Sequence, residues 1–199
     1  MHLWSIFFPF LTAFLLCLTT GATATPAAAQ SVFINEIYYD NSGTDAGEAI
    51  EIAGPAGTDL TGWTLVLYNG TGGAVYDTRT LTGMILDQQN GFGTLPVTYA
   101  VTGIQNGAPD GIALVNASNT VIQLLSYEGT FTAVVGPANG LISTDIGVDE
   151  DPAPAVGLSL QLTGTGTVYT DFTWQSPTTN TFGAINAAQT FATGTAAGS

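Results

Sequence analysis

The groups in this sequence that could carry out chemistry are almost all carboxylates. Its 199 residues include 15 Asp and Glu, one Arg, one His and no Lys, and the formal net charge is −14 at pH 7. The densest group of acids is Glu36, Asp40, Asp45, Glu48 and Glu51. Oxygen ligands without nitrogen or sulfur suit Ca²⁺. Asp40, Asp45 and Glu48 are therefore candidate Ca²⁺ ligands, and a solvated acidic loop held by structural hydrogen bonds is the favoured interpretation of the same residues.

The other acidic residues offer weaker sites. Asp145 and residues 149–151 lie in a segment that contains Pro and several acids. These acids could serve solubility alone or bind a metal ion. Glu128 follows an apolar run, and we expect it to accept backbone N–H groups of the next turn. Two carboxylates could also form a glycosidase pair, but that mechanism needs a cleft and one raised pKa, neither of which a sequence reveals.

The charge balance excludes several classes of partner. Arg79 is the only Arg, so the chain cannot bind nucleic acid through Lys and Arg contacts to phosphates, and direct contact would need divalent ions. A basic helix at a membrane surface is excluded for the same reason. Hydrophobic residues make up 45% of the chain, which argues against disorder despite the high charge. We expect a globular protein.

The first 29 residues have the layout of a secretory signal peptide. An apolar run, LWSIFFPFLTAFLLCL at 3–18, precedes small and polar residues and an Ala-Ala-Ala stretch at 27–29. An uncleaved anchor is the alternative, although the run is short for a bilayer span of about 20 residues. We predict cleavage near residue 29, a secreted, extracellular or periplasmic location, and no membrane attachment afterwards.

Cleavage would remove both His2 and Cys17, the only His and Cys. The mature chain would then lack thiol, imidazole and lysine amine, so it could form no disulfide, no Ser-His-Asp triad and no metal site with Cys or His ligands. Only carboxylates, Tyr and one Arg remain for chemistry. We therefore predict that the protein is not an enzyme and has no cofactor apart from the possible Ca²⁺.

The elements that must position these residues are short strands. Apolar runs are broken by turn signals every 8 to 15 residues or so, and no long 3.6-residue period occurs, which is typical of an all-β sandwich. We predict one domain over residues 30–192 and a flexible tail at 193–199. The expected strands are 32–39, 49–53, 63–68, 75–81, 97–102, 111–115, 121–127, 159–162 and 171–175.

The aromatic residues allow two interpretations. Trp63, Trp174 and several Tyr could form a face on which sugars stack, but such residues more often fill the core of a sandwich. Both Trp alternate with apolar neighbours, which favours the core.

Three segments in order resemble the opening of the lamin tail domain, in the version found in secreted bacterial proteins. They are INEI at 34–37, EAIEI at 48–52 and DLTGWTL at 59–65, and similar blocks continue to about residue 191. The matching motif residues are Asn35, Glu36, Glu48, Glu51, Gly62 and Trp63. The resemblance implies an immunoglobulin-like β-sandwich that acts as an accessory module beside secreted hydrolases and has no catalytic residue of its own.

Three functions are therefore expected. The first is a secreted, non-catalytic lamin-tail-like module that mediates protein or surface interactions. The second is a Ca²⁺-dependent carbohydrate-binding module, whose partner would be a cell-surface or other polysaccharide. The third is an accessory part or fragment of an extracellular nuclease. The sequence does not predict an oligomeric state.

Overall fold

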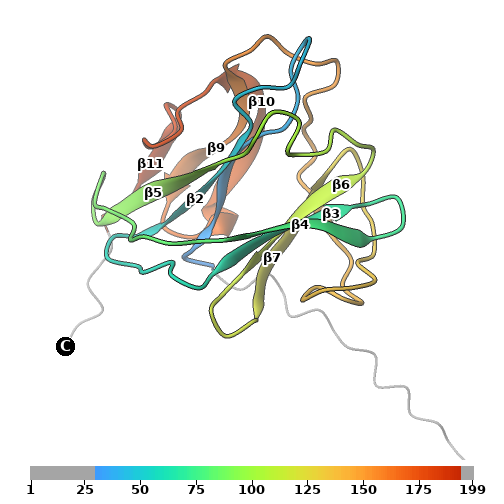
Figure 1. The fold of residues 1–199 in the computed structure, drawn as a ribbon. Coiled ribbons are helices and arrows are strands. Elements are labelled where there is room, and N and C mark those ends of the chain that lie inside the picture. Colours follow the sequence, from blue (N-terminus) through green and yellow to red (C-terminus); the bar gives the residue numbers. More distant parts are fainter. Residues whose placement is uncertain (1–29, 194–199) are drawn as a thin grey trace, which may run out of the picture.

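The computed structural model describes residues 30–193, which form an almost entirely β structure (Figure 1). The only helical element in this part of the chain is a short 3₁₀ turn, Tyr169–Asp171. The strands are β1 (Phe33–Tyr38), β2 (Ala49–Pro55), β3 (Thr64–Asn69), β4 (Ala74–Thr80), β5 (Phe92–Thr98), β6 (Asp110–Val115), β7 (Val121–Tyr127), β8 (Thr144–Asp145), β9 (Leu158–Gly166), β10 (Phe172–Thr179) and β11 (Gln189–Phe191).

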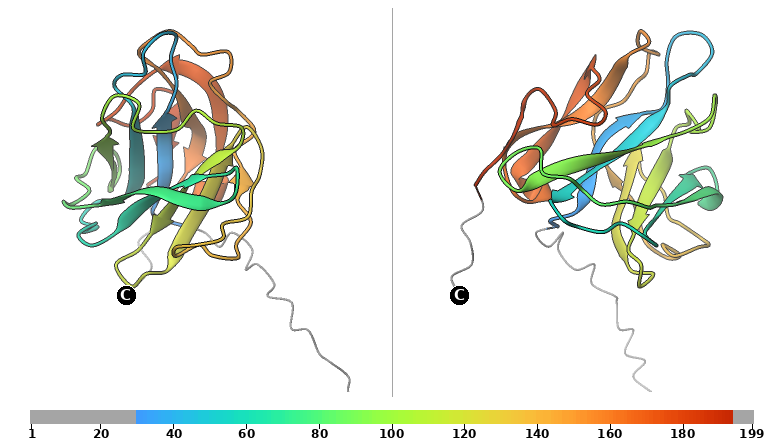
Figure 2. Two further views of the ribbon diagram at one scale, coloured as in Figure 1. Left: turned by 45° about the vertical axis from the view of Figure 1, so that its right-hand side comes forward. Right: turned by 60° about the vertical axis from the view of Figure 1, so that its left-hand side comes forward.

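The strands form two sheets that pack as layers (Figures 1 and 2). The first sheet has the order β10-β9-β1-β2-β5, with β11 added parallel to β9. The second sheet has the order β4-β3-β6-β7-β8, in which only the short β8 is parallel to its neighbour. The predicted all-β sandwich is thus confirmed. No helix within residues 30–193 is long and apolar enough to cross a membrane.

The main core lies between the two sheets. Alternate residues of the central strands point inward, as the two-residue period of a strand requires. Ile50 and Ile52 of β2 face Leu65 and Leu67 of β3 across this core, and all four are fully buried. Burying an aliphatic side chain of this size contributes roughly 1.5–3 kcal/mol, so this layer is the main source of stability.

The outer face of each sheet is covered as well, which is why the central strands show continuous burial. Residues of the segment after β7, including Phe131 and Ala138, pack on Val66 and Tyr68 of the second sheet. Phe191 of β11 stacks on Phe92 of β5 with ring centroids 4.7 Å apart, over the first sheet. Each sheet is therefore buried on both sides over its centre.

The prediction for one strand was wrong in position. Residues 97–102 were expected to form a strand, but β5 begins at Phe92 and ends at Thr98. The strand contains Gly93 and Pro96, and Pro is tolerated because β5 is an edge strand. Tyr99 still donates its N–H to the Glu48 carbonyl, and the chain turns at Val101 and Thr102. The short strands β8 and β11 were not predicted.

Several expectations concern residues beyond those described. The predicted signal peptide at 1–29 and all but the first residue of the predicted tail at 193–199 lie outside the described range.

Candidate functional site

Six carboxylic side chains are buried, although Asp and Glu are rarely buried unless they are paired. Asp45 lies with Asp40, and the other five are almost completely buried. These five fall into two groups. Glu48, Asp110 and Glu150 hold loops at one end of the sandwich, and Glu36 and Glu51 lie on the first sheet.

Glu48 clamps the loop that follows β5. Its two carboxylate oxygens accept the backbone N–H groups of Gly103 at 2.7 Å and Ile104 at 2.9 Å. Its own backbone carbonyl accepts the N–H of Tyr99 at 2.9 Å. Burial raises the pKa of Glu48, and the two backbone N–H groups oppose that rise by stabilising the charged form. Both oxygens of this predicted Ca²⁺ ligand thus already have partners.

Glu150 clamps the end of β1 from 111 residues away in sequence. One oxygen, Oε2, accepts the backbone N–H groups of Tyr39 at 2.7 Å and Asp40 at 2.8 Å. The Tyr39 hydroxyl accepts the N–H of Glu150 at 2.8 Å and donates to Glu128 at 2.8 Å. The Tyr39 ring stacks on Tyr127, with centroids 3.9 Å apart. Burial raises the pKa of Glu150 to about 8.

These contacts separate the members of the second predicted acidic group. Glu150 is buried and structural, whereas Asp145, Asp149 and Asp151 are exposed. Glu128 was expected to accept N–H groups of the turn that follows it. Its Oε2 instead accepts the N–H of Ala108, which lies before it in the chain, at 3.3 Å.

Asp40 and Asp45 lie together, while Glu48 is engaged elsewhere. Burial and the neighbouring Asp45 charge raise the pKa of Asp40. Asp45 accepts the backbone N–H of Asn41 at 3.2 Å and the side-chain amide of Asn106 at 2.9 Å. In the part of the chain that the structure describes, no three His, Cys, Asp or Glu side chains are grouped so that they could hold a metal ion. The Ca²⁺ site at Asp40, Asp45 and Glu48 stays a prediction.

The second group of carboxyls lies on the first sheet, under the segment after β10. Glu36 accepts the Ser159 hydroxyl at 2.6 Å and the Thr181 backbone N–H at 2.8 Å through Oε1. Its Oε2 accepts the Thr181 hydroxyl at 2.9 Å. Glu51 accepts the Asn35 amide at 3.1 Å and the backbone N–H of Gly183. These bonds fasten residues 181–183 onto the sheet.

Burial raises the pKa of both carboxyls in this group. That of Glu51 rises to about 8, and the Glu36 charge adds to the rise. At neutral pH Glu51 is therefore largely a neutral acid in the folded protein.

The surface of residues 30–193 includes the following two hollows. One, of about 560 Å³, is lined by Phe92, residues 165–168 and Asp171, and the other, of about 230 Å³, by Trp63 and Ile122 among others. Asp171 is the single carboxylate among their lining residues, and it accepts backbone N–H groups of Thr167 and Val168. A glycosidase pair would need two carboxylates in one cleft, and neither hollow provides them.

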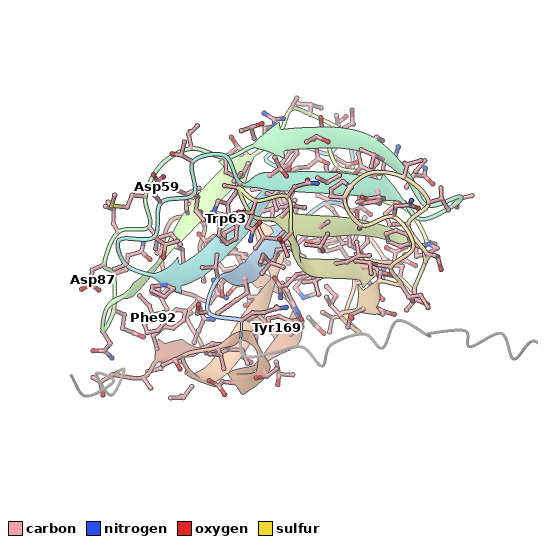
Figure 3. The ribbon with its side chains drawn as sticks, turned by 90° about the horizontal axis from the view of Figure 1, so that it is seen from below. Asp59, Trp63, Asp87, Phe92 and Tyr169 are labelled. Atoms are coloured by element: carbon pink, nitrogen blue, oxygen red, sulfur yellow. The ribbon has the colours of Figure 1, made fainter. Side chains whose placement is uncertain are left out.

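The side chains of Trp63 and Trp174 are half-buried. Trp63 begins the run into β3 and packs against the main core, and the Trp174 indole N–H donates to the Tyr169 hydroxyl at 3.0 Å. Figure 3 shows Trp63, Phe92 and Tyr169 on the same side of the molecule. This placement supports the interpretation of the Trp residues as core, with one edge near the surface.

The residues of the lamin-tail motif all have structural contacts. The four polar ones are fully buried and hydrogen-bonded, and Gly62 has a φ of 82°, which favours glycine. Sequence reasoning missed several of their partners, because these come from distant parts of the chain. They are Asn186, Thr181, Gly183, Gly103 and Ile104.

Fold and contacts together define an all-β sandwich whose buried carboxyls hold loops and a C-terminal segment onto its sheets. In comparisons with known proteins, no family model, no curated protein and no solved structure matches this chain. The resemblance to the lamin tail domain therefore rests on the sequence motifs alone.

Proposed function

We propose that this chain is a secreted, non-catalytic module of the lamin-tail, immunoglobulin-like type that mediates protein or surface interactions. The observation that carries the proposal is the state of its carboxyls. Glu36, Glu48, Glu51 and Glu150 each accept at least two hydrogen bonds from within the fold, and Asp110 holds Gly70 and Gly107 in the same way. Carboxylates whose oxygens already accept hydrogen bonds from the fold stabilise the sandwich and are not available as catalytic groups.

An exposed apolar surface supports the interaction role. The loop between β7 and β8 folds back on itself, with the Ala133 N–H donating to the Leu141 carbonyl at 3.0 Å. Its inner residues cover the second sheet, while four large apolar side chains on it face solvent. We name this apolar loop by those residues: Val134, Val135, Leu141 and Ile142. Grouped exposed apolar residues mark interaction sites more often than single ones do.

The absence of catalysis is tested directly. The purified protein is incubated with plasmid DNA, RNA and soluble polysaccharides, with and without Mg²⁺ and Ca²⁺. We expect no product above a buffer control. Reproducible, metal-dependent hydrolysis that follows the protein through purification would overturn the non-catalytic part of the proposal.

The interaction role is tested with a matched pair of variants. Ile142 is 71% exposed on the apolar loop, and Leu86 is 68% exposed on the connection between β4 and β5. Binding to washed cells of the producing organism should fall several-fold for Ile142→Asp and stay unchanged for Leu86→Asp. Equal binding of both variants would show that the apolar loop is not the interaction surface.

Ca²⁺-dependent carbohydrate binding is the second candidate, and the closeness of Asp40 to Asp45 favours it. Calorimetry with Ca²⁺ and thermal melts with and without a chelator test it. Ca²⁺ at 100 times its Kd should add about 2.7 kcal/mol of stability. An unchanged melting temperature after chelation would remove this candidate. The nuclease-accessory alternative is supported by the resemblance alone, and a catalytic domain in the same gene product would favour it.

A further inference from the structure

The strand β4 forms an open edge of the second sheet. It pairs with β3 on one side only (Figure 3). Its residues 78–80 are exposed. An open edge presents unpaired backbone N–H and C=O groups, and natural proteins often protect it with Lys, Pro or a bulge. The strand AVYDTRT contains no Pro. It carries two charges, Asp77 and Arg79, opposite the buried Leu67 and Leu65, and its bulge lies toward its start, between the partners of Leu67 and Tyr68.

The open edge carries one positive and one negative side chain, although the protein as a whole is strongly acidic. Arg79, the only Arg of the chain, lies on β4, two residues after Asp77. The register with β3 pairs Arg79 with Leu65 and Asp77 with Leu67, so both side chains lie on the same face of the sheet. The guanidinium lies 4.9 Å from the centre of the Tyr99 ring, which holds it at this edge.

The hydrogen bonds to β3 show which backbone N–H and C=O groups of β4 point toward β3 and which point toward the open edge. The N–H of Leu81 donates to the Trp63 carbonyl at 2.7 Å, toward β3. Because the groups of successive residues in an antiparallel ladder alternate in direction, those of Arg79 and Asp77 also face β3. The N–H and C=O groups of Thr78 and Thr80 therefore face the open edge.

We infer that the open edge of β4 is a homodimer interface, in which two copies pair antiparallel about a two-fold axis at Thr78. In this register Thr78 lies opposite Thr78 of the partner subunit, and their outward N–H and C=O groups exchange two hydrogen bonds. Asp77 then lies opposite Arg79 of the partner subunit, and the symmetry repeats this ion pair. These flanking pairs are of the non-hydrogen-bonded type, in which cross-strand side chains approach most closely.

The same charges select this register and this partner. Other antiparallel registers must keep the outward backbone groups of Thr78 and Thr80 paired. The nearest such register in one direction places Asp77 opposite Asp77 of the partner subunit, and the nearest in the other direction places Arg79 opposite Arg79 of the partner subunit. Both alternatives bring like charges together, so one register alone is favoured. A second copy also supplies a guanidinium to Asp77 and a carboxylate to Arg79. Because both β4 edges are used up in this two-fold pairing, no further copy can add at β4.

The inference goes beyond the proposed function and does not depend on it. The test uses sedimentation velocity on the purified full chain from micromolar to submillimolar concentration, at about 0.15 M salt to screen long-range repulsion. We expect a concentration-dependent dimer. Arg79→Asp leaves two acids on the edge, and Asp77→Arg leaves two cations. For each variant alone, the dissociation constant of the dimer should rise at least about tenfold above that of the wild type.

The decisive sample is an equimolar mixture of the Arg79→Asp and Asp77→Arg proteins. Its two edges are complementary, so the mixture should form a heterodimer that neither variant forms with itself. The double variant Asp77→Arg/Arg79→Asp should regain the homodimer, because it exchanges the two partners of each ion pair.

A backbone variant makes the test independent of charge. Thr78→Pro removes an outward N–H and leaves the groups that face β3 in place, so it should abolish the dimer. Thermal melts of every variant identify any that fail to fold. The inference is overturned if the wild-type chain is monomeric throughout the range, or if folded Thr78→Pro dimerises as the wild type does. A mixture that associates no better than its two components would also overturn it.

Discussion

Glu36 and Glu51 lie directly opposite each other on the neighbouring strands β1 and β2, and both carboxyls are completely buried. Like charges in this position would repel strongly in a medium of low dielectric. The fold relieves that repulsion in two ways: it surrounds Glu36 with hydrogen-bond donors, and it raises the pKa of Glu51 to about 8. Protonation of Glu51 therefore affects how firmly residues 181–183 are held on the first sheet.

This relationship predicts how stability depends on pH. The pKa of Glu51, like that of Glu150, is about 8 in the folded protein, whereas the ordinary value is 4.5. Between pH 4.5 and pH 8 the unfolded chain releases protons that the folded chain retains, so the free energy of unfolding falls as pH rises. Each group should remove on the order of 4 kcal/mol across that window. Thermal or urea unfolding should show greater stability at pH 5 than at pH 8.5.

The high negative charge of the chain changes stability in the same direction, so a control is needed. Glu51→Gln keeps the size of the side chain and removes its titration. Because its NH₂ group cannot accept one of the two bonds that Glu51 accepts from Asn35 and Gly183, the variant loses some stability at every pH. Its stability should nevertheless depend less steeply on pH than that of the wild type. If the two proteins have parallel pH profiles, Glu51 is not the source of the dependence.

A second prediction concerns the Glu48 clamp. Glu48→Gln replaces one of two accepting oxygens with an NH₂ group, which cannot accept the N–H of Gly103 or Ile104. The loop after β5 should open more readily, at a cost of about 1–3 kcal/mol in stability. Hydrogen exchange should accelerate at these two amides and remain unchanged in β6. Unaltered exchange at both amides would contradict the assignment of Glu48 as a clamp.

A third prediction tests how the apolar loop is attached. The nearest atom to a Cβ on Gly73 would be the Thr132 carbonyl oxygen at 2.0 Å, whereas a Cβ on Gly72 would meet nothing within 4 Å. Both glycines have positive φ, so Gly72→Ala reports backbone strain, and Gly73→Ala adds a collision with the loop. Gly73→Ala should destabilise the protein by about 1–3 kcal/mol more than Gly72→Ala. Equal urea midpoints would mean that the loop can move aside freely.

The sequence allowed prediction of the features that depend on local pattern. Short apolar runs broken by turn signals predicted the central strands and the sandwich, and the total apolar content predicted a globular protein. It could not show the contacts that give each acid its role, because these join residues far apart. Glu150 reaches the Tyr39 N–H and Thr181 reaches Glu36 across more than 100 residues. A carboxylate that clamps a backbone and one that binds a metal are the same residue type in a sequence.

Trp63 provides the fourth prediction. Its ring is half-buried and packs against the main core at the start of β3, beside a hollow of about 230 Å³. Complete burial would make Trp63→Ala cost about 3–5 kcal/mol, and partial burial should reduce this to about 2–3 kcal/mol. Trp63→Phe should recover most of the loss, because the ring edge that meets the core is retained. Urea unfolding of the two variants measures both values. A loss below about 0.5 kcal/mol for the alanine variant would mean that the ring contributes little to the core and would favour the sugar-stacking interpretation instead.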